Sequence, residues 1–181
     1  MRRKSIATFL GVALVSTLMV GAGAVGATID NDTTAVVAYR GVPRVTRAVF
    51  NDGQPTTTST TFQNVPGMKI THYLPKTQNE MLLITVSAFT KCDDTDGPVD
   101  VWCEIRVLVD GVECNPGGRT IFDSAPASSN DGNAWASHTH QFVCKRDRQG
   151  NHPIQLQFRV DQSGKFWLDN VVMSVQAARM W

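Results

Sequence analysis

Apolar and polar residues alternate with a period of two along many short segments of this chain, which is the pattern of half-buried β-strands. In residues 154–161 the alternation runs without a break. Residues 81–90 carry apolar side chains on both faces, which predicts a strand inside a sheet rather than at its edge. No long window shows apolar residues at helical spacing. The pattern therefore predicts an all-β protein.

A hairpin is predicted where the strand at 101–109 ends. Asp110-Gly111 follows it, and this dipeptide best supports the positive φ angles of a two-residue turn, so residues 112–114 fold back beside the strand. A change of apolar phase near Asp169-Asn170 predicts a β-bulge. Weaker strand candidates are 35–39, 47–50, 58–63, 68–74, 135–143 and 166–177.

The low-complexity run 56–61 consists of good strand formers, and we interpret it as an exposed edge strand. Turn residues mark loops at 93–98, 115–118, 124–133 and 145–151. About eight to ten short strands in one domain fit two packed antiparallel sheets. We therefore predict an antiparallel β-sandwich with a jelly-roll-like strand order.

The first 27 residues resemble an export signal. Arg2, Arg3 and Lys4 precede an apolar run that ends in the small residues 25–27. A positive start, an apolar core and a small-residue end are typical of a cleaved secretory signal peptide, so we predict a signal at 1–27 and one folded domain at 28–181. The alternative is an uncleaved anchor, because residues 6–27 are long enough to span a bilayer. We expect secretion, with no membrane contact after cleavage.

The charge balance argues against nucleic acid as a partner. The chain has 17 basic and 16 acidic residues, and three basic residues leave with the signal, so 14 basic residues remain and the net charge falls to −2. A duplex-binding surface usually needs a clustered excess of Lys and Arg.

All four cysteines, Cys92, Cys103, Cys114 and Cys144, lie after the predicted signal. An even number of cysteines in an oxidising compartment is normally a disulfide framework, so we predict two disulfides. A zinc site made by four thiolates is the alternative, but no Cys-x-x-Cys pair is present.

The predicted hairpin limits how the cysteines pair. It places Val107 opposite Cys114 and leaves Cys103 four residues further along its strand, about 13 Å away. The α-carbons of a disulfide lie within about 7 Å of each other, which excludes Cys103–Cys114 and its complement Cys92–Cys144. Of the pairings that remain, we favour Cys92–Cys103, which closes a loop between consecutive strands, with Cys114–Cys144.

Part of the chain resembles a group of small secreted proteins of actinobacterial type with no assigned function. The resemblance rests on residues 87–89, Cys92, 102–111, Glu113, Pro116, 122–124, His152 and 166–169. It implies a jelly-roll-like sandwich that is loosely similar in strand pattern to complement C1q-type and carbohydrate-binding domains. Cys114 and Cys144 are not part of the pattern of that group.

Two sets of residues are candidate metal ligands. His138 and His140 share one face of a predicted strand, and His-x-His can offer two imidazoles to one metal. Asp94 and Asp96 could supply oxygens to calcium in an irregular loop, although the EF-hand spacing fails. Asp169 is a further carboxylate candidate by analogy with carbohydrate-binding jelly rolls. We predict no cofactor, with calcium as the alternative, and ordinary structural or solvated roles for these side chains as the competing interpretation.

Aromatic residues carry the binding hypothesis. Trp102, Trp135 and Trp167 could stack on sugar rings if exposed, or fill the sandwich if buried. Trp102 shares with Arg106 the strand face opposite the predicted core. We take Trp102, Arg106 and Trp167 as the candidate ligand-binding residues.

The sequence contains no catalytic signature. We therefore interpret the protein first as a secreted, non-enzymatic module that binds an extracellular glycan, a cell-wall polymer or a protein. One alternative is a secreted hydrolase whose site is assembled only in three dimensions. The other is a structural subunit that self-associates into an oligomer.

Overall fold

The computed structural model describes residues 34–41, 44–75, 80–94, 100–125 and 134–179, with residues 34–46 and 179 described by their backbone alone. These residues form eleven strands, and among them there is no helix that is long and apolar enough to cross a membrane. The predicted signal at 1–27 and Asp96 lie outside the described residues.

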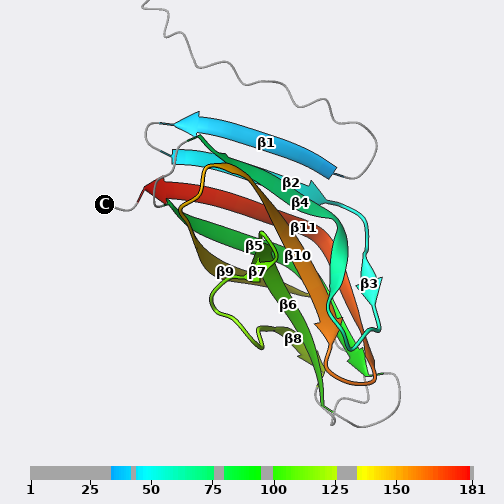
Figure 1. The fold of residues 1–181 in the computed structure, drawn as a ribbon. Coiled ribbons are helices and arrows are strands. Elements are labelled where there is room, and N and C mark those ends of the chain that lie inside the picture. The colour runs from blue at the N-terminus through cyan, green and yellow to red at the C-terminus, as the bar shows by residue number, and fades with distance from the viewer. Residues whose placement is uncertain (1–33, 42–43, 76–79, 95–99, 126–133, 180–181) are drawn as a thin grey trace, which may run out of the picture.

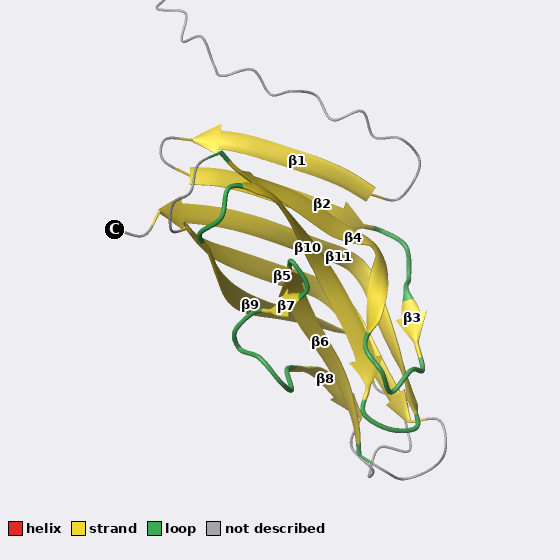
Figure 2. Ribbon diagram, viewed as in Figure 1, coloured by secondary structure: helices red, strands yellow, loops and turns green. Residues whose placement is uncertain are grey.

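Two antiparallel sheets face each other (Figures 1 and 2). Sheet A has the spatial order β1 (Thr34–Gly41), β2 (Arg44–Asn51), β11 (Gly164–Arg179), β5 (Glu80–Asp94) and β9 (Ala136–Arg146), with β3 (Thr56–Thr57) beside β11. Sheet B has the order β4 (Gln63–Leu74), β10 (Gly150–Val160), β6 (Val101–Val109) and β7 (Val112–Glu113), with β8 (Ile121–Ala125) also paired to β6.

The connections confirm the jelly-roll prediction. From β2 onward the chain passes to sheet B at β4, returns at β5, crosses to β6 and β8, and alternates again through β9, β10 and β11. Sheet neighbours are therefore mostly strands that are distant in sequence, as in two interlocked Greek keys.

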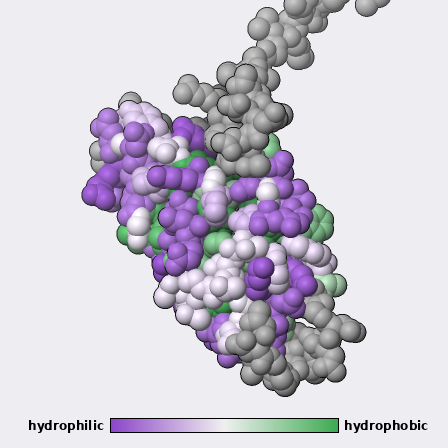
Figure 3. Space-filling model, turned by 90° about the vertical axis from the view of Figure 1, so that its right-hand side faces the viewer, coloured by the Kyte–Doolittle hydropathy of each residue, from purple (hydrophilic) through white to green (hydrophobic). Residues whose placement is uncertain are grey.

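The core lies between the inner faces of the two sheets. The inward residues of the two clearest predicted strands, β5 and β10, are all buried, as the alternation predicts. The side of the molecule shown in Figure 3 is mostly hydrophilic, with small hydrophobic patches. The buried set includes Leu82, Ile84, Val86, Ala88, Ile154, Leu156, Phe158 and Val160.

The predicted turn and bulge are both present. Asp110 and Gly111 have φ angles of 56° and 77°, and Val109 pairs with Val112 across the turn. In β11 the register shifts between Asp169 and Val172, where Asn170 has a φ of 50°. The bulge returns Val171 to the core side of the sheet.

The predicted strand at 58–63 and the predicted edge strand at 56–61 are wrong. Only Thr56 and Thr57 pair with β11, and residues 58–62 are irregular. Side chains replace the ladder there: the Ser59 amide donates to Thr57 Oγ1 at 3.0 Å, and the Thr61 amide donates to Ser59 Oγ at 3.1 Å. Short hydroxyl side chains compete in this way with strand hydrogen bonds.

Both predicted disulfides are confirmed, and each joins sheet A to sheet B. Cys92 of β5 is bonded to Cys103 of β6, and Cys144 of β9 is bonded to Cys114, which follows β7. Cys144 lies opposite Leu82, ten residues from Cys92 along β5, so the two crosslinks are separated by about 33 Å of strand. Each end of the sandwich is therefore crosslinked, as is typical of proteins in oxidising surroundings.

Candidate functional site: an aromatic platform on sheet A

Three aromatic side chains share the outer face of sheet A. Phe89 of β5 lies opposite Ser137 of β9 on one side and Asp169 of β11 on the other. Trp167 is two residues from Asp169 and faces the same way. Trp135 immediately precedes β9, and continuing the strand alternation by one residue puts it on the same side as Ser137. We call Phe89, Trp135 and Trp167 the aromatic platform.

The platform is open to solvent and has a defined spacing. Phe89 is 48% exposed and Trp135 is 43% exposed, while Trp167 is partly exposed. Trp167 pairs with Lys91 on one side of β5. Continuing the β5–β9 register one residue beyond Thr90–Ala136 puts Trp135 opposite Lys91 on the other side, so the two tryptophan backbones are about 10 Å apart. Phe89 lies on β5, two residues from Lys91, and completes a triangle.

Polar groups surround the three rings. Lys91 Nζ lies 2.9 Å from Asp93 Oδ2 and 5.1 Å from the centre of the Trp167 ring. Lys165 Nζ lies 4.6 Å from the same ring. Gln54 Nε2 donates to Asp169 Oδ2 at 3.4 Å. Amide, carboxylate and ammonium groups are therefore within reach of a ligand that rests on the rings.

Apolar side chains continue along the same face, away from the platform. Val172 of β11, Val143 of β9 and Met81 of β5 are all exposed. Their register partners on this face include Ser87, Leu83 and Lys145, so the surface there is mixed rather than uniformly apolar.

The structure separates the predicted ligand-binding residues. Trp167 belongs to the platform, whereas Trp102 and Arg106 lie on β6, on the outer face of sheet B. Trp102 is partly exposed, and the Arg119 guanidinium lies 5.9 Å from its ring. The three residues therefore do not form one site.

Glu104, two residues after Trp102 on β6, carries a buried carboxylate. The Glu104 side chain is 0% exposed, although it is on the outer side of sheet B. Arg119 Nε donates to its Oε1, and Arg159 donates to its Oε2 from Nε at 2.8 Å and from Nη2 at 2.7 Å. Asp161 holds Arg119 from the other side and accepts the Trp102 amide at 2.8 Å.

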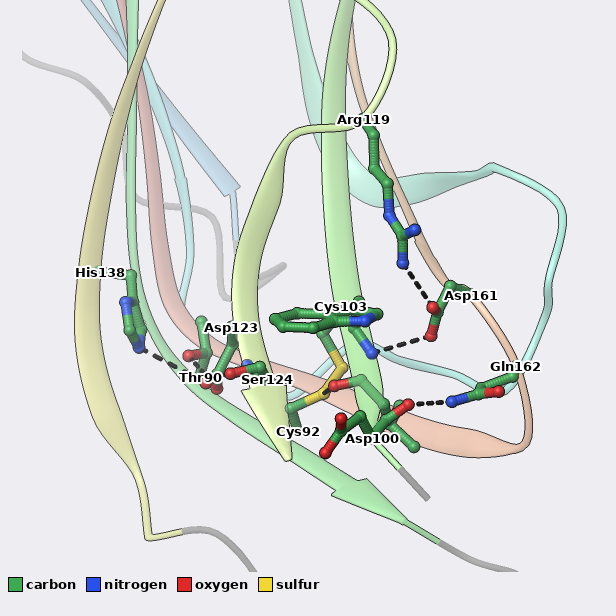
Figure 4. Close-up of a disulfide and its surroundings, with 12 residues drawn as sticks. Thr90, Cys92, Asp100, Cys103, Arg119, Asp123, Ser124, His138, Asp161 and Gln162 are labelled. Carbon is green, nitrogen blue, oxygen red and sulfur yellow. Dashed lines mark hydrogen bonds and ion pairs between the residues drawn. A yellow bond between two sulfur atoms is a disulfide. The ribbon is translucent and has the colours of Figure 1, made fainter. Parts of the chain in front are cut away.

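This arrangement raises the pKa of Arg119. Desolvation lowers that pKa, but the hydrogen bond and charge of Glu104, together with those of Asp161, outweigh it. The guanidinium is therefore a permanent cation above Glu104. Figure 4 shows Arg119 reaching towards Asp161 close to the Cys92–Cys103 disulfide.

His138 and His140 share one side of β9, as predicted, and this side faces β8 and the core. His138 Nε2 lies 3.7 Å from Asp123 Oδ1, and the Thr90 hydroxyl donates to Asp123 Oδ2 at 2.6 Å (Figure 4). The Ser124 amide donates to Asp123 Oδ1 at 2.7 Å. The ring of His140 instead contacts Phe142, at 5.0 Å between ring centres.

Metal binding stays a prediction. Among the residues that the structure describes, no three His, Cys, Asp or Glu side chains gather closely enough to hold a metal ion. Asp94 ends β5, while Asp169 lies beside the platform. The proposed calcium ligands Asp94 and Asp96 stay a prediction as well, since Asp96 is outside the described residues.

The candidate residues chosen from the sequence did not include Phe89 or Glu104. The alternation in residues 81–90 puts Phe89 on the face opposite Leu82, Ile84, Val86 and Ala88, but both faces carry apolar residues, so the sequence did not show which face is exposed. For Glu104 no local signal existed, because its partners are 15 and 55 residues away.

Comparison with known proteins gives no family. No family model matches the sequence, and no curated protein matches it significantly. One similar solved structure is the CBM22-1 xylan-binding domain of Paenibacillus barcinonensis Xyn10C, with 13% identity over 78% of this chain and 80% of that chain and a TM-score of 0.29.

Another is the CBM22-1-GH10 part of Clostridium thermocellum endo-1,4-beta-D-xylanase 10B complexed with xylohexaose, with 12% identity over 83% of this chain and 26% of that chain and a TM-score of 0.23. These neighbours include carbohydrate-binding modules. Because both TM-scores are below 0.5, neither similarity establishes a fold or a function for this chain.

Proposed function

We propose that this protein is a secreted, non-enzymatic module that binds an extracellular glycan on the aromatic platform. The observation that carries the proposal is the joint exposure of Phe89 and Trp135 beside Trp167 on one face of sheet A. Two disulfides support an oxidising location, and the expected signal at 1–27 supports export.

Large apolar rings on the outside of a sheet add nothing to the core and lower solubility, so their clustering points to a ligand. An aromatic face suits the C–H face of a sugar ring, since both are flat and weakly polar. The two tryptophans stand about 10 Å apart, with Phe89 offset between them, which allows consecutive rings of a glycan chain to be contacted.

The polar groups around the platform suit binding rather than chemistry. Lys91 is paired with Asp93, Gln54 with Asp169, and the Ser87 and Thr139 hydroxyls with each other at 2.9 Å. Groups held in this way can exchange hydrogen bonds with sugar hydroxyls. A few placed polar groups beside an apolar surface are what fixes the orientation of a ligand.

Self-association is the second candidate, and the exposure of Val172, Val143 and Met81 on the same face favours it. A second copy of the chain can pack against an apolar strip of this kind and cover it. The native mass at increasing protein concentration distinguishes glycan binding from self-association. A glycan-binding module stays monomeric with Trp167 and Phe89 intact. A self-associating subunit forms a dimer, and the Val172→Lys variant no longer forms it.

The test of the platform is binding of the mature protein to a panel of soluble and insoluble polysaccharides, with and without EDTA. Trp135→Ala, Phe89→Ala and Trp167→Ala are each expected to weaken binding about fivefold to thirtyfold, or about 1–2 kcal/mol, because each removes a ring from the contact. An effect of EDTA would add a calcium ion to the site.

Tyr73→Ala is the matched control, since Tyr73 is as exposed as Phe89 but lies on β4 of the opposite sheet. It is expected to bind as the unchanged protein does. No polysaccharide binding, or equal losses for Tyr73→Ala and Trp167→Ala, would contradict the platform proposal.

A further inference from the structure

A row of three polar side chains crosses sheet B, on the side of the molecule opposite the platform. Gln157 of β10 lies in register with Arg106 of β6 on one side and with Asn64 of β4 on the other. Arg106 Nε donates to Gln157 Oε1 at 2.7 Å, and Gln157 Nε2 donates to Asn64 Oδ1 at 2.8 Å. We call Arg106, Gln157 and Asn64 the donor row.

The hydrogen bonds of the row run in one direction, and the arginine fixes that direction. A guanidinium can only donate, so the carbonyl oxygen of Gln157 must face Arg106 and its amide nitrogen must face Asn64. The carbonyl oxygen of Asn64 must then face Gln157. The side-chain acceptors are used inside the row, and N–H donors remain at both ends: the Asn64 amide and the terminal nitrogens of Arg106.

Arg106 is held in place by its surroundings. Its guanidinium carbon lies 4.1 Å from the centre of the Phe62 ring, and that of Arg159 lies 4.5 Å from the same ring. The Arg106 side chain is 29% exposed. Arg106 Nη1 makes a long ion pair with Glu113 Oε2 at 3.6 Å, beyond hydrogen-bond length, while Glu113 Oε1 accepts a hydrogen bond from the Gly118 amide at 2.8 Å. The outer edge of the guanidinium can therefore accept a further carboxylate.

We propose that the donor row binds the carboxylate groups of an acidic, uronic acid-containing polysaccharide. A fixed guanidinium recognises a carboxylate with two parallel hydrogen bonds. The donors at the two ends belong to strands two positions apart, about 10 Å, so a chain with repeated acceptors can engage both ends. The partly exposed Phe62 ring beside Arg106 offers an apolar contact for a sugar. The site shares no residue with the aromatic platform.

The experiment measures binding of the mature, disulfide-bonded protein to polygalacturonate. Arg106→Gln is expected to weaken binding about tenfold or more, because it removes hydrogen bonds to a charged group. Arg106→Lys keeps the charge but not the planar pair of donors, and it is expected to restore only part of the binding. Asn64→Ala is expected to weaken binding by a smaller factor, since its end of the row is neutral.

Lys69→Gln is the matched control, because Lys69 is exposed on the same face, pairs with Gln155 and carries the same charge. It is expected to change binding less than twofold. Equal losses for Lys69→Gln and Arg106→Gln would show diffuse charge attraction and overturn the site. So would an unchanged affinity in Arg106→Gln, or no binding to polygalacturonate at all.

A polyglutamate arm tests the ligand class. If polyglutamate binds as well as polygalacturonate, and its binding depends equally on Arg106, the donor row binds the carboxylates of an acidic protein and the polysaccharide assignment is wrong. The aromatic platform is tested separately, since Trp167→Ala is expected to leave the Arg106-dependent binding of polygalacturonate unchanged. Loss of one binding activity without the other therefore identifies which proposal has failed.

Discussion

Breaking both disulfides is expected to leave the chain largely unfolded at 37 °C. In the loop-entropy account, a crosslink with a sequence separation of 11 stabilises the fold by about 2.8 kcal/mol, and one with a separation of 30 by about 3.7 kcal/mol. Their sum, about 6.5 kcal/mol, is comparable with the whole stability of a small domain. The loss is large because each crosslink joins sheet A to sheet B, and the remaining links between the sheets are side-chain packing and individual hydrogen bonds such as Thr90 to Asp123.

All four cysteines are buried, so the disulfides are reduced in denaturant and the reduced, alkylated chain is then returned to buffer. Circular dichroism and thermal unfolding compare it with an oxidised sample treated in the same way. The paired variants Cys92→Ala with Cys103→Ala and Cys114→Ala with Cys144→Ala give the separate contributions. The second pair is expected to cost more, because its loop is longer. A reduced chain that refolds with an unchanged midpoint would contradict this prediction, because the sheets would then hold together without the disulfides.

Local rules were sufficient where the fold is decided by a few neighbouring residues. The unbroken alternation in β10 gave a strand with one buried side, and Asp110-Gly111 gave the hairpin. That hairpin excluded one disulfide pairing by distance, so a two-residue turn helped to define the crosslinks of the two sheets. The phase change near Asp169 likewise gave the bulge in β11.

Local rules failed where side chains compete with the backbone. Thr57 and Thr61 favour strands by propensity, but the hydroxyls of Thr57, Ser59 and Thr61 bond to neighbouring groups and end the ladder after β3. The strand β8 was not predicted at all. It is only five residues long, and it is stabilised by pairing with β6 rather than by its own pattern.

The candidate site depends on strand order, which the sequence does not display. Trp135, Phe89 and Trp167 belong to separate parts of the chain, and only the neighbouring positions of β9, β5 and β11 bring them together. The same order sends Trp102 and Arg106 to the opposite face from Trp167. Alternation separates the two faces of a single strand, but it does not show which residues of different strands share an outer face.

Glu104→Gln is expected to destabilise the fold by about 3–5 kcal/mol, which corresponds to a fall in Tm on the order of 10 °C for a domain of this size. Both oxygens of the carboxylate accept hydrogen bonds from arginines, and the group has no contact with water. In the variant, an amide N–H₂ meets a guanidinium, so two donors face each other and two cations lose their buried counter-charge.

Glu113→Gln is the matched control, since Glu113 makes one long ion pair with Arg106 and is partly exposed. Exposed pairs contribute about 0–1 kcal/mol, so this variant is expected to unfold close to the midpoint of the unchanged protein. Urea and thermal unfolding with both disulfides intact measure the difference between the two. Equal midpoints for the two variants would contradict the account. A loss confined to Glu104→Gln would show that a carboxylate on the outer side of a sheet contributes as much as a core residue, because Arg119 and Arg159 close over it and exclude water.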